Sequence, residues 1–205
     1  MPIKFVDEAD LTTVGNAIRA KTGGSDLLTF PAGMAEAIAG ISGGGGDDGS
    51  FKAVIERTAT NPTLPSDLTK IGSFAFGDYN KLTMLSIPAG VTIIGNHAFD
   101  SCANLALTSL PVGVTSIGDY AFYSCSKLAL TEMPDGVTNI GSYAFRYCYA
   151  LTILTFRGTP IVLSQTAFQN CANLTAINVP WAEGAVTGAP WGATNATINY
   201  NYTGG

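Results

Sequence analysis

Apolar positions recur along this chain with a fixed spacing. An Ala-Phe pair begins at residues 75, 98, 121, 144 and 167, so the period is 23 residues without slippage. Each copy follows the pattern L-x-x-(L/T)-x-Φ-P-x-G-V-T-x-I-G-x-x-A-F-x-x-C, in which Φ is an apolar residue. A unit of this length buries one side and needs its neighbours to complete a core, so the pattern predicts a solenoid.

The third copy indicates what each part of the unit should form. Its first strand is expected to point three residues inward: Leu105, Thr108 and Leu110. Pro111 and Gly113 turn the chain, a second short strand runs to Ile117, and Gly118 makes the next corner. Three further residues should line the interior through a helical turn: Ala121, Phe122 and Cys125. The expected fold class is therefore a β-rich (α+β) solenoid with 23-residue coils.

Both ends of the repeat region depart from the pattern. Residues 50–57 alternate in polarity, which predicts a first strand. Residues 181–205 are expected to cap the solenoid of residues 51–180, with three side chains facing inward: Ile198, Tyr200 and Tyr202. Trp181 and Trp191 lie in this cap, where they should cover the last coil; a platform for carbohydrate is the alternative.

The front of the chain has a different organisation. In residues 1–42, Asp10 suits an N-cap, and Pro31 suits the start of a second helix. Both stretches place apolar residues on one face, so they predict a helical hairpin that attaches to another protein or another copy. Residues 43–50 are rich in glycine and predict a flexible linker.

Two resemblances add to this organisation. The units "LTMLSIPAGVTIIGNHAFDSCANL" and "LALTEMPDGVTNIGSYAFRYCYAL" resemble the Treponema-type, or BspA-like, leucine-rich repeat over residues 59–180. The segment "ADLTTVGNAIRAKTGG…LTFPAGM…AI" resembles an N-terminal segment of tail, baseplate and other virion-associated proteins of bacteriophages and prophages. The ending "VPWAEGAVTGAPWGATNATINYNY" is similar to phage-encoded repeat proteins. These resemblances imply that the part before Gly43 anchors the chain to a virion while the solenoid projects.

Composition narrows the function classes. Charged residues make up 12% of the chain, against about 25% in a typical domain, which fits coils that stack on one another. The net charge is −5 and no basic stripe occurs, so nucleic acid is not expected as a partner. No apolar run approaches the ~18 residues of a membrane span, and the first residues lack the apolar core of a signal peptide. No cofactor is expected, because the sequence holds no P-loop.

The residues that often carry chemistry occupy repeat positions. Four cysteines fall at one position of successive copies: Cys102, Cys125, Cys148 and Cys171. Parallel side chains about 5 Å apart do not favour disulfides, so a buried ladder is expected, with metal or redox chemistry as a minor alternative. His97 is the only histidine and sits where other copies have Phe, Tyr or Thr, so we expect it to be structural. The chain is not expected to be an enzyme.

Binding is the better-supported expectation, because variable positions of a repeat face solvent and solenoids present long surfaces. In the third and fourth copies these positions gather residue types that carry contact energy at interfaces. The candidate binding residues are Tyr120, Tyr123, Tyr143, Arg146, Tyr147 and Tyr149. The alternative for Tyr120 and Tyr143 is that they pack as a ladder with the corresponding Phe74 and His97. A second candidate face is the apolar strand row of Met84, Leu107, Leu130, Ile153 and Ala176.

The function expected is that of a virion-associated binding protein, a component of a tail, baseplate or fibre. Residues 1–42 would contact other virion proteins, and the solenoid would bind a bacterial surface glycan or protein or a neighbouring virion protein. A homo-oligomer is a further partner that the sequence allows. The expected location is the virion. The alternative is a bacterial cell-surface BspA-like adhesin, for which a signal peptide and a membrane or wall anchor would be expected.

Overall fold

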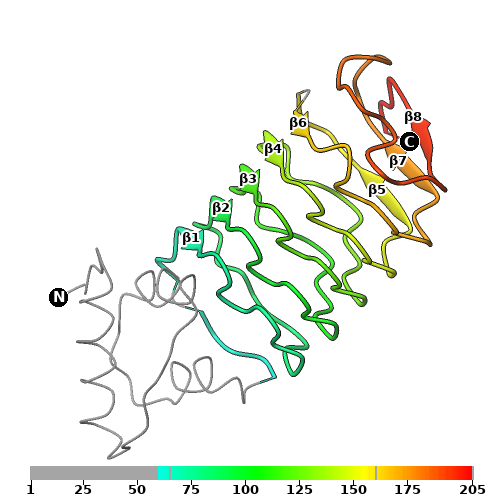
Figure 1. Cartoon of the computed structure of the whole chain (residues 1–205). Coiled ribbons are helices and arrows are strands. Elements are labelled where there is room, and N and C mark those ends of the chain that lie inside the picture. The colour runs from blue at the N-terminus through cyan, green and yellow to red at the C-terminus, as the bar shows by residue number, and fades with distance from the viewer. Residues whose placement is uncertain (1–59, 65, 160, 205) are drawn as a thin grey trace, which may run out of the picture.

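The computed structural model describes residues 60–64, 66–159 and 161–204, and these residues form a solenoid (Figure 1). Successive coils stack side by side along the chain, as the 23-residue period predicted. We number coils 1 to 5 by their buried phenylalanines: Phe76, Phe99, Phe122, Phe145 and Phe168. Coil 2 starts at Leu82, coil 3 at Leu105, coil 4 at Leu128 and coil 5 at Leu151. The predicted helical hairpin of 1–42, the linker of 43–50 and the first strand at 50–57 lie outside the described residues.

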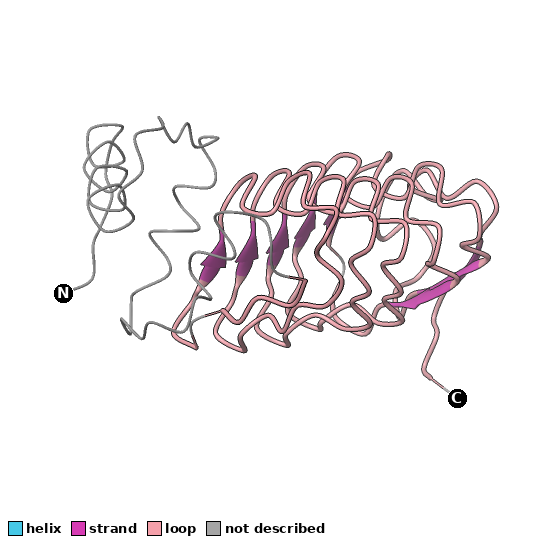
Figure 2. Cartoon of the chain, turned by 90° about the horizontal axis from the view of Figure 1, so that it is seen from below, coloured by secondary structure: helices cyan, strands magenta, loops and turns pink. Residues whose placement is uncertain are grey.

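Two parallel sheets join the coils. The larger sheet has the order β1-β2-β3-β4-β6 and runs along one side of the solenoid (Figure 2). Its strands are β1 (Lys70–Ile71), β2 (Ile93–Ile94), β3 (Ser116–Ile117), β4 (Asn139–Ile140) and β6 (Val162–Leu163). Each residue pairs with the one 23 positions later, as Ile94 does with Ile117. The smaller sheet consists of β5 (Ile153–Thr155), β7 (Ala176–Asn178) and β8 (Thr197–Asn199), in that order.

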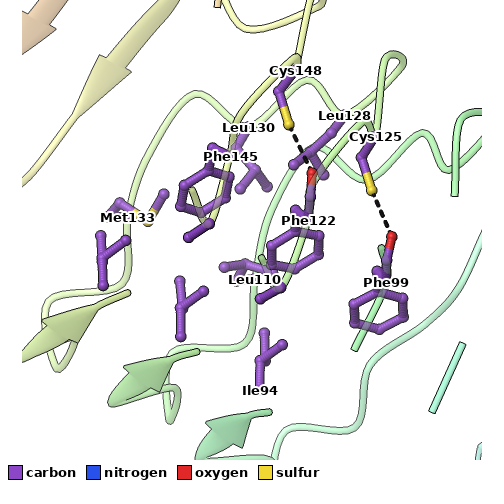
Figure 3. Packing of buried hydrophobic residues seen from close by; sticks show 14 of the residues in the cluster. Ile94, Phe99, Leu110, Phe122, Cys125, Leu128, Leu130, Met133, Phe145 and Cys148 are labelled. Carbon is purple, nitrogen blue, oxygen red and sulfur yellow. Dashed lines mark hydrogen bonds between the residues drawn. The ribbon is translucent and has the colours of Figure 1, made fainter. Parts of the chain in front are cut away.

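A ladder of phenylalanine rings forms the centre of the core. The five rings stack in sequence with centroids 5.1, 5.1, 5.4 and 5.3 Å apart. The four cysteines lie beside them and are buried as thiols, which confirms the predicted core ladder. Figure 3 shows that the thiols of Cys125 and Cys148 point to the carbonyl oxygens of Phe99 and Phe122, at 3.0 and 3.1 Å. The thiols therefore act as hydrogen-bond donors between coils.

The segment around each Ala-Phe pair is a run of tight turns, so the predicted helical turn is wrong. In coil 3, the amides of Tyr123 and Cys125 donate within the coil, to the carbonyls of Tyr120 and Phe122. The alternate amides of Phe122 and Ser124 donate instead to coil 4, over 2.7 and 2.8 Å. Tyr120 and Ser124 both have φ of 56°, which a right-handed helix does not allow. The described residues contain no helix, because half of these amides hold neighbouring coils together.

The predicted corner at Gly118 depends on a close approach between coils. A Cβ atom at this position would lie 2.7 Å from the backbone nitrogen of Asn96 and 2.8 Å from the carbonyl carbon of Gly95. The next residue, Asp119, donates its amide to the side-chain oxygen of Asn96 at 2.9 Å. Its own carboxylate accepts the amide of Ser142 at 2.6 Å. Side chains thus extend the backbone ladder at the corner, and glycine leaves the room for it.

The first strand of coil 3 buries a different residue from the one predicted. Leu105 and Leu110 are buried as expected, but Thr108 is exposed and Leu107 is buried in its place. Coil 4 repeats this arrangement and buries Leu130. In coils 2 and 5 the buried residue lies one position later, at Leu85 and Leu154. The prediction failed because the backbone slips by one residue in coils 3 and 4.

The C-terminal residues cover the end of the solenoid. Trp191 is fully buried and Trp181 nearly so. Their burial confirms that they cover the last coil and contradicts an exposed carbohydrate platform. Both indole N–H groups are used internally, by the carbonyls of Thr187 and Gly158 at 3.0 and 2.7 Å. Ile198, Tyr200 and Tyr202 are partly buried while the asparagines between them are exposed, as predicted. Within the described residues, no helix has the length and hydropathy needed to span a membrane.

Candidate functional site

An aromatic ladder runs along the outside of coils 1 to 4. Phe74 stacks on His97 with ring centroids 4.5 Å apart, and His97 stacks on Tyr120 at 4.7 Å. Tyr120 then packs against Tyr143 at 5.1 Å with a tilt of 38°. The structure thus contains the ladder considered as the alternative for the two tyrosines. Because His97 and Tyr120 have a ring on each side, these two inner rings present their edges to a partner.

These four residues have a backbone conformation that is unusual for aromatic residues. Their φ angles are 59°, 53°, 56° and 56° for Phe74, His97, Tyr120 and Tyr143. A left-handed conformation at a residue other than glycine costs on the order of 1 kcal/mol. Hydrogen bonds between coils accompany it: the amide of His97 donates to Asp119 and that of Tyr120 to Ser142, at 2.8 and 2.9 Å. The contacts between coils therefore hold the ladder in a fixed geometry.

Arg146 lies beside the ladder on coil 4. Its guanidinium carbon is 4.7 Å from the ring centre of Tyr147, 5.2 Å from that of Tyr143 and 6.0 Å from that of Tyr123. Its Nη2 atom donates a hydrogen bond of 2.9 Å to the hydroxyl of Tyr147. Cations over aromatic faces at these distances are stabilised by the ring quadrupoles. Three tyrosines thus hold the charge in place.

The remaining predicted residues join the same cluster. Tyr123 lies 5.6 Å from Tyr120 and 5.5 Å from Tyr147, the latter in an edge-to-face contact. Tyr147 lies 6.1 Å from Tyr149, whose side chain is 44% exposed. The structure therefore brings all six predicted residues into one connected surface. We call it the tyrosine–arginine corner: Tyr120, Tyr123, Tyr143, Arg146, Tyr147 and Tyr149.

His97 also makes a polar contact next to the corner. Its Nδ1 atom lies 2.8 Å from a carboxylate oxygen of Asp100, whose other oxygen accepts a hydrogen bond from the Ser101 hydroxyl at 2.9 Å. The ring is held between Phe74 and Tyr120 at the same time. The histidine position in the repeat thus serves the ladder, in line with the structural role expected for it.

The cysteine thiols are buried in the core, and this burial changes their pKa values. Burial raises the pKa of Cys125 and Cys148 well above the usual value of 9.0, and it raises the pKa of Cys171 to about 12. Neighbouring thiols add to the effect for Cys125 and Cys148. A protonated thiol is a weak nucleophile and a poor metal ligand. The part of the chain that the structure describes holds no group of three or more His, Cys, Asp and Glu side chains that could bind a metal ion.

A groove between coils 2 and 3 was missed by the sequence analysis. Two backbone hydrogen bonds join coils 2 and 3. The amide of Ala106 donates to the carbonyl of Thr83 at 2.9 Å, and the amide of Thr115 donates to the carbonyl of Thr92 at 2.8 Å. Between these two bonds lies a groove of about 360 Å³. It is lined by residues 84–87, 89 and 106–111, none of them charged. A polar threonine at position 108, where coil 2 has Leu85, was the signal in the sequence.

The second candidate face of the sequence analysis is not a continuous apolar row. Met84 and Ile153 are exposed, by 63% and 48%, but Leu107 and Leu130 are buried because of the backbone slip. The exposure of Ala176 is intermediate between these two groups. The predicted row is therefore wrong in its middle.

Comparison with known proteins agrees with this architecture. A family model described as the BspA type leucine rich repeat region matches residues 50–180 in six copies. No curated protein matches the chain.

Solved structures show the same repeat. A leucine-rich repeat protein from Bacteroides ovatus is 32% identical over 60% of this chain, with a TM-score of 0.52. The T. pallidum leucine rich repeat protein is 26% identical over 68% of this chain, with a TM-score of 0.50. The pneumococcal vaccine antigen PcpA, at 20% identity over 69% of this chain and a TM-score of 0.51, shares the fold. The chain spans 32%, 78% and 41% of the lengths of these three proteins.

Proposed function

Because this chain belongs to the BspA-type leucine-rich repeat family, we propose that it is a non-enzymatic recognition protein whose tyrosine–arginine corner binds a partner. The observation that carries the proposal is the corner itself. Six residues of the types that dominate interface energy meet on two adjacent coils, and inter-coil contacts fix their geometry. A rigid surface loses little conformational entropy on binding, which favours affinity.

The non-enzymatic part of the proposal follows from how the chain uses its reactive side chains. The cysteine thiols donate to backbone carbonyls inside the core. His97, the only histidine of the sequence, is stacked between two rings. The thiols are therefore buried away from any substrate, and the imidazole is stacked between rings and bonded through Nδ1 to Asp100.

For the biological setting, the first candidate is a virion. It is supported by the resemblance of residues 1–42 and of the C-terminal end to phage-encoded proteins. In this setting the front segment attaches the chain to a tail, baseplate or fibre, and the corner recognises a bacterial surface glycan or protein. The second candidate is a bacterial cell-surface adhesin, which family membership favours. Gold-labelled antibody against the chain would distinguish them, because label on purified particles supports the first and label on intact cells supports the second.

Binding by the corner can be tested with the full-length chain, fluorescently labelled, on whole cells of candidate host bacteria. The corner variant is Tyr123→Ala/Arg146→Ala/Tyr147→Ala. A matched control replaces three exposed residues of the strand side of the same coils: Thr108→Ala/Ser109→Ala/Thr131→Ala. We expect the corner variant to lose binding and the control variant to keep it. Wild-type binding to none of these hosts, or equal loss in both variants, would contradict the proposal.

A further inference from the structure

Arg146 has an unusual electrostatic position in this protein. The other arginine in the described part of the chain, Arg157 on coil 5, donates to the carboxylate of Glu132 at 2.7 Å. Arg146 makes no ion pair with any carboxylate among the described residues, and its surroundings are the three tyrosine rings. The nearest acid of its row of the repeat, Asp100 on coil 2, is engaged by His97 and Ser101. Within the described ranges, no carboxylate therefore compensates the positive charge of Arg146.

Its hydrogen-bonding capacity is also incompletely used. A guanidinium carries five N–H donors. One, on Nη2, goes to the Tyr147 hydroxyl at 2.9 Å. The Nε atom is buried and has no hydrogen-bond partner among the residues that the structure describes. Because Nε is buried, a ligand would accept from the terminal nitrogens of the guanidinium, and hydrogen bonds that join a charged donor to an ionised acceptor are stronger than neutral ones.

We propose that Arg146 is an oxyanion-binding site, which takes a carboxylate or phosphate group of a surface polymer. This inference rests on the proposed function and specifies the ligand chemistry of the same corner. The planar fork of arginine matches both anions, and hydrogen bonds to ionised acceptors are about twice as strong as neutral ones. The neighbouring tyrosines hold the fork in place, and Tyr149 supplies an exposed ring edge and hydroxyl for the adjoining sugar or polyol.

The overall charge of the chain makes this site separable from general electrostatic attraction. The net charge is −5, so the protein as a whole repels a polyanion. Binding of an acidic polymer that depends on one arginine therefore reports a local site.

The test uses three polymers and the full-length chain. Polygalacturonate carries carboxylates, poly(glycerol phosphate) carries phosphates, and dextran is the neutral control. Binding is measured by calorimetry for the wild type and for Arg146→Gln. Glutamine is chosen because coil 5 has Gln169 at the same repeat position, so the fold already accepts it. Lys81→Gln removes one positive charge from an exposed position of coil 1 and serves as the matched control. Circular dichroism confirms that each variant is folded.

We expect at least one acidic polymer to bind, dextran not to bind, and Arg146→Gln to weaken binding by about tenfold or more while Lys81→Gln does not. The polymer that binds tells whether carboxylate or phosphate is the anion. Absence of binding by both acidic polymers, equal binding of dextran, or full binding by Arg146→Gln would overturn the inference. Corner-dependent attachment to whole cells is measured separately, so a positive cell assay with a negative polymer assay distinguishes this failure from failure of the proposed function.

Discussion

Replacing Phe122 with alanine tests whether the phenylalanine ladder holds the solenoid together. The Phe122 ring is fully buried and stacks on both sides, at 5.1 Å from Phe99 and 5.4 Å from Phe145. A buried Phe→Ala change costs about 3–5 kcal/mol, and each aromatic pair contributes about 0.5–1.5 kcal/mol beyond the buried area. Since both pairs are lost, we expect the free energy of unfolding to fall by about 4–5 kcal/mol.

Phe168 provides an internal comparison. It is equally buried, but among the described residues it stacks on one ring, that of Phe145 at 5.3 Å. Phe168→Ala should therefore cost about 1 kcal/mol less than Phe122→Ala. Phe122→Leu keeps most of the volume and should cost about 1.5 kcal/mol.

The assay is urea unfolding of the full-length chain, followed by circular dichroism and extrapolated linearly to zero urea. A loss below about 1 kcal/mol for Phe122→Ala would refute the reasoning, because it would mean that the ladder adds little to the stacking of coils. An equal loss for Phe122→Ala and Phe168→Ala would refute the specific contribution of ring pairs.

Three further predictions concern stability. Gly118→Ala should lower the free energy of unfolding by about 1–3 kcal/mol in the same assay, because its Cβ would meet the backbone of coil 2; no loss would contradict the close approach. Asp119→Ala should cost about 1 kcal/mol, since the amide of Ser142 loses its acceptor, and an unchanged urea midpoint would argue against this role. Unfolding releases the protons of the buried thiols, whose pKa is raised in the folded state. The free energy of unfolding should therefore be constant below pH 9.0 and fall as the pH rises toward about 12. Cys171→Ala should make this fall smaller. A urea midpoint that does not change with pH above 9.0 would contradict the prediction.

The parts of the fold that could be predicted are those tied to the period. A strict 23-residue repeat places equivalent residues in register, so the burial of Phe122 and Cys125 and the corner at Gly118 followed directly from the sequence. The cap followed from alternation, because Ile198 and Tyr200 are apolar where the neighbouring asparagines are polar.

The parts that could not be predicted arise from the backbone. The helical turn was wrong because the left-handed conformation of Tyr120 and Ser124 sends alternate amides to the next coil, and a pattern of side chains does not reveal this. The slip that buries Leu107 and exposes Thr108 could have been inferred from the threonine, but the repeat pattern treated Leu and Thr as equivalent there. The six residues of the candidate site were found by their types and repeat positions. The unpaired charge of Arg146 depends on its three-dimensional surroundings and required the structure.

The central claim is that the partner contacts the tyrosine–arginine corner, and photo-crosslinking tests it most directly. A photoreactive p-benzoylphenylalanine would replace Tyr149, 44% exposed at the corner, or Met84, 63% exposed at the groove between coils 2 and 3. Each full-length variant would be bound to envelope fragments of a bacterium that the wild-type chain recognises, and then irradiated. The account predicts a crosslinked product from position 149 and none from position 84. A product from position 84 alone would contradict it and would place the binding surface at the groove.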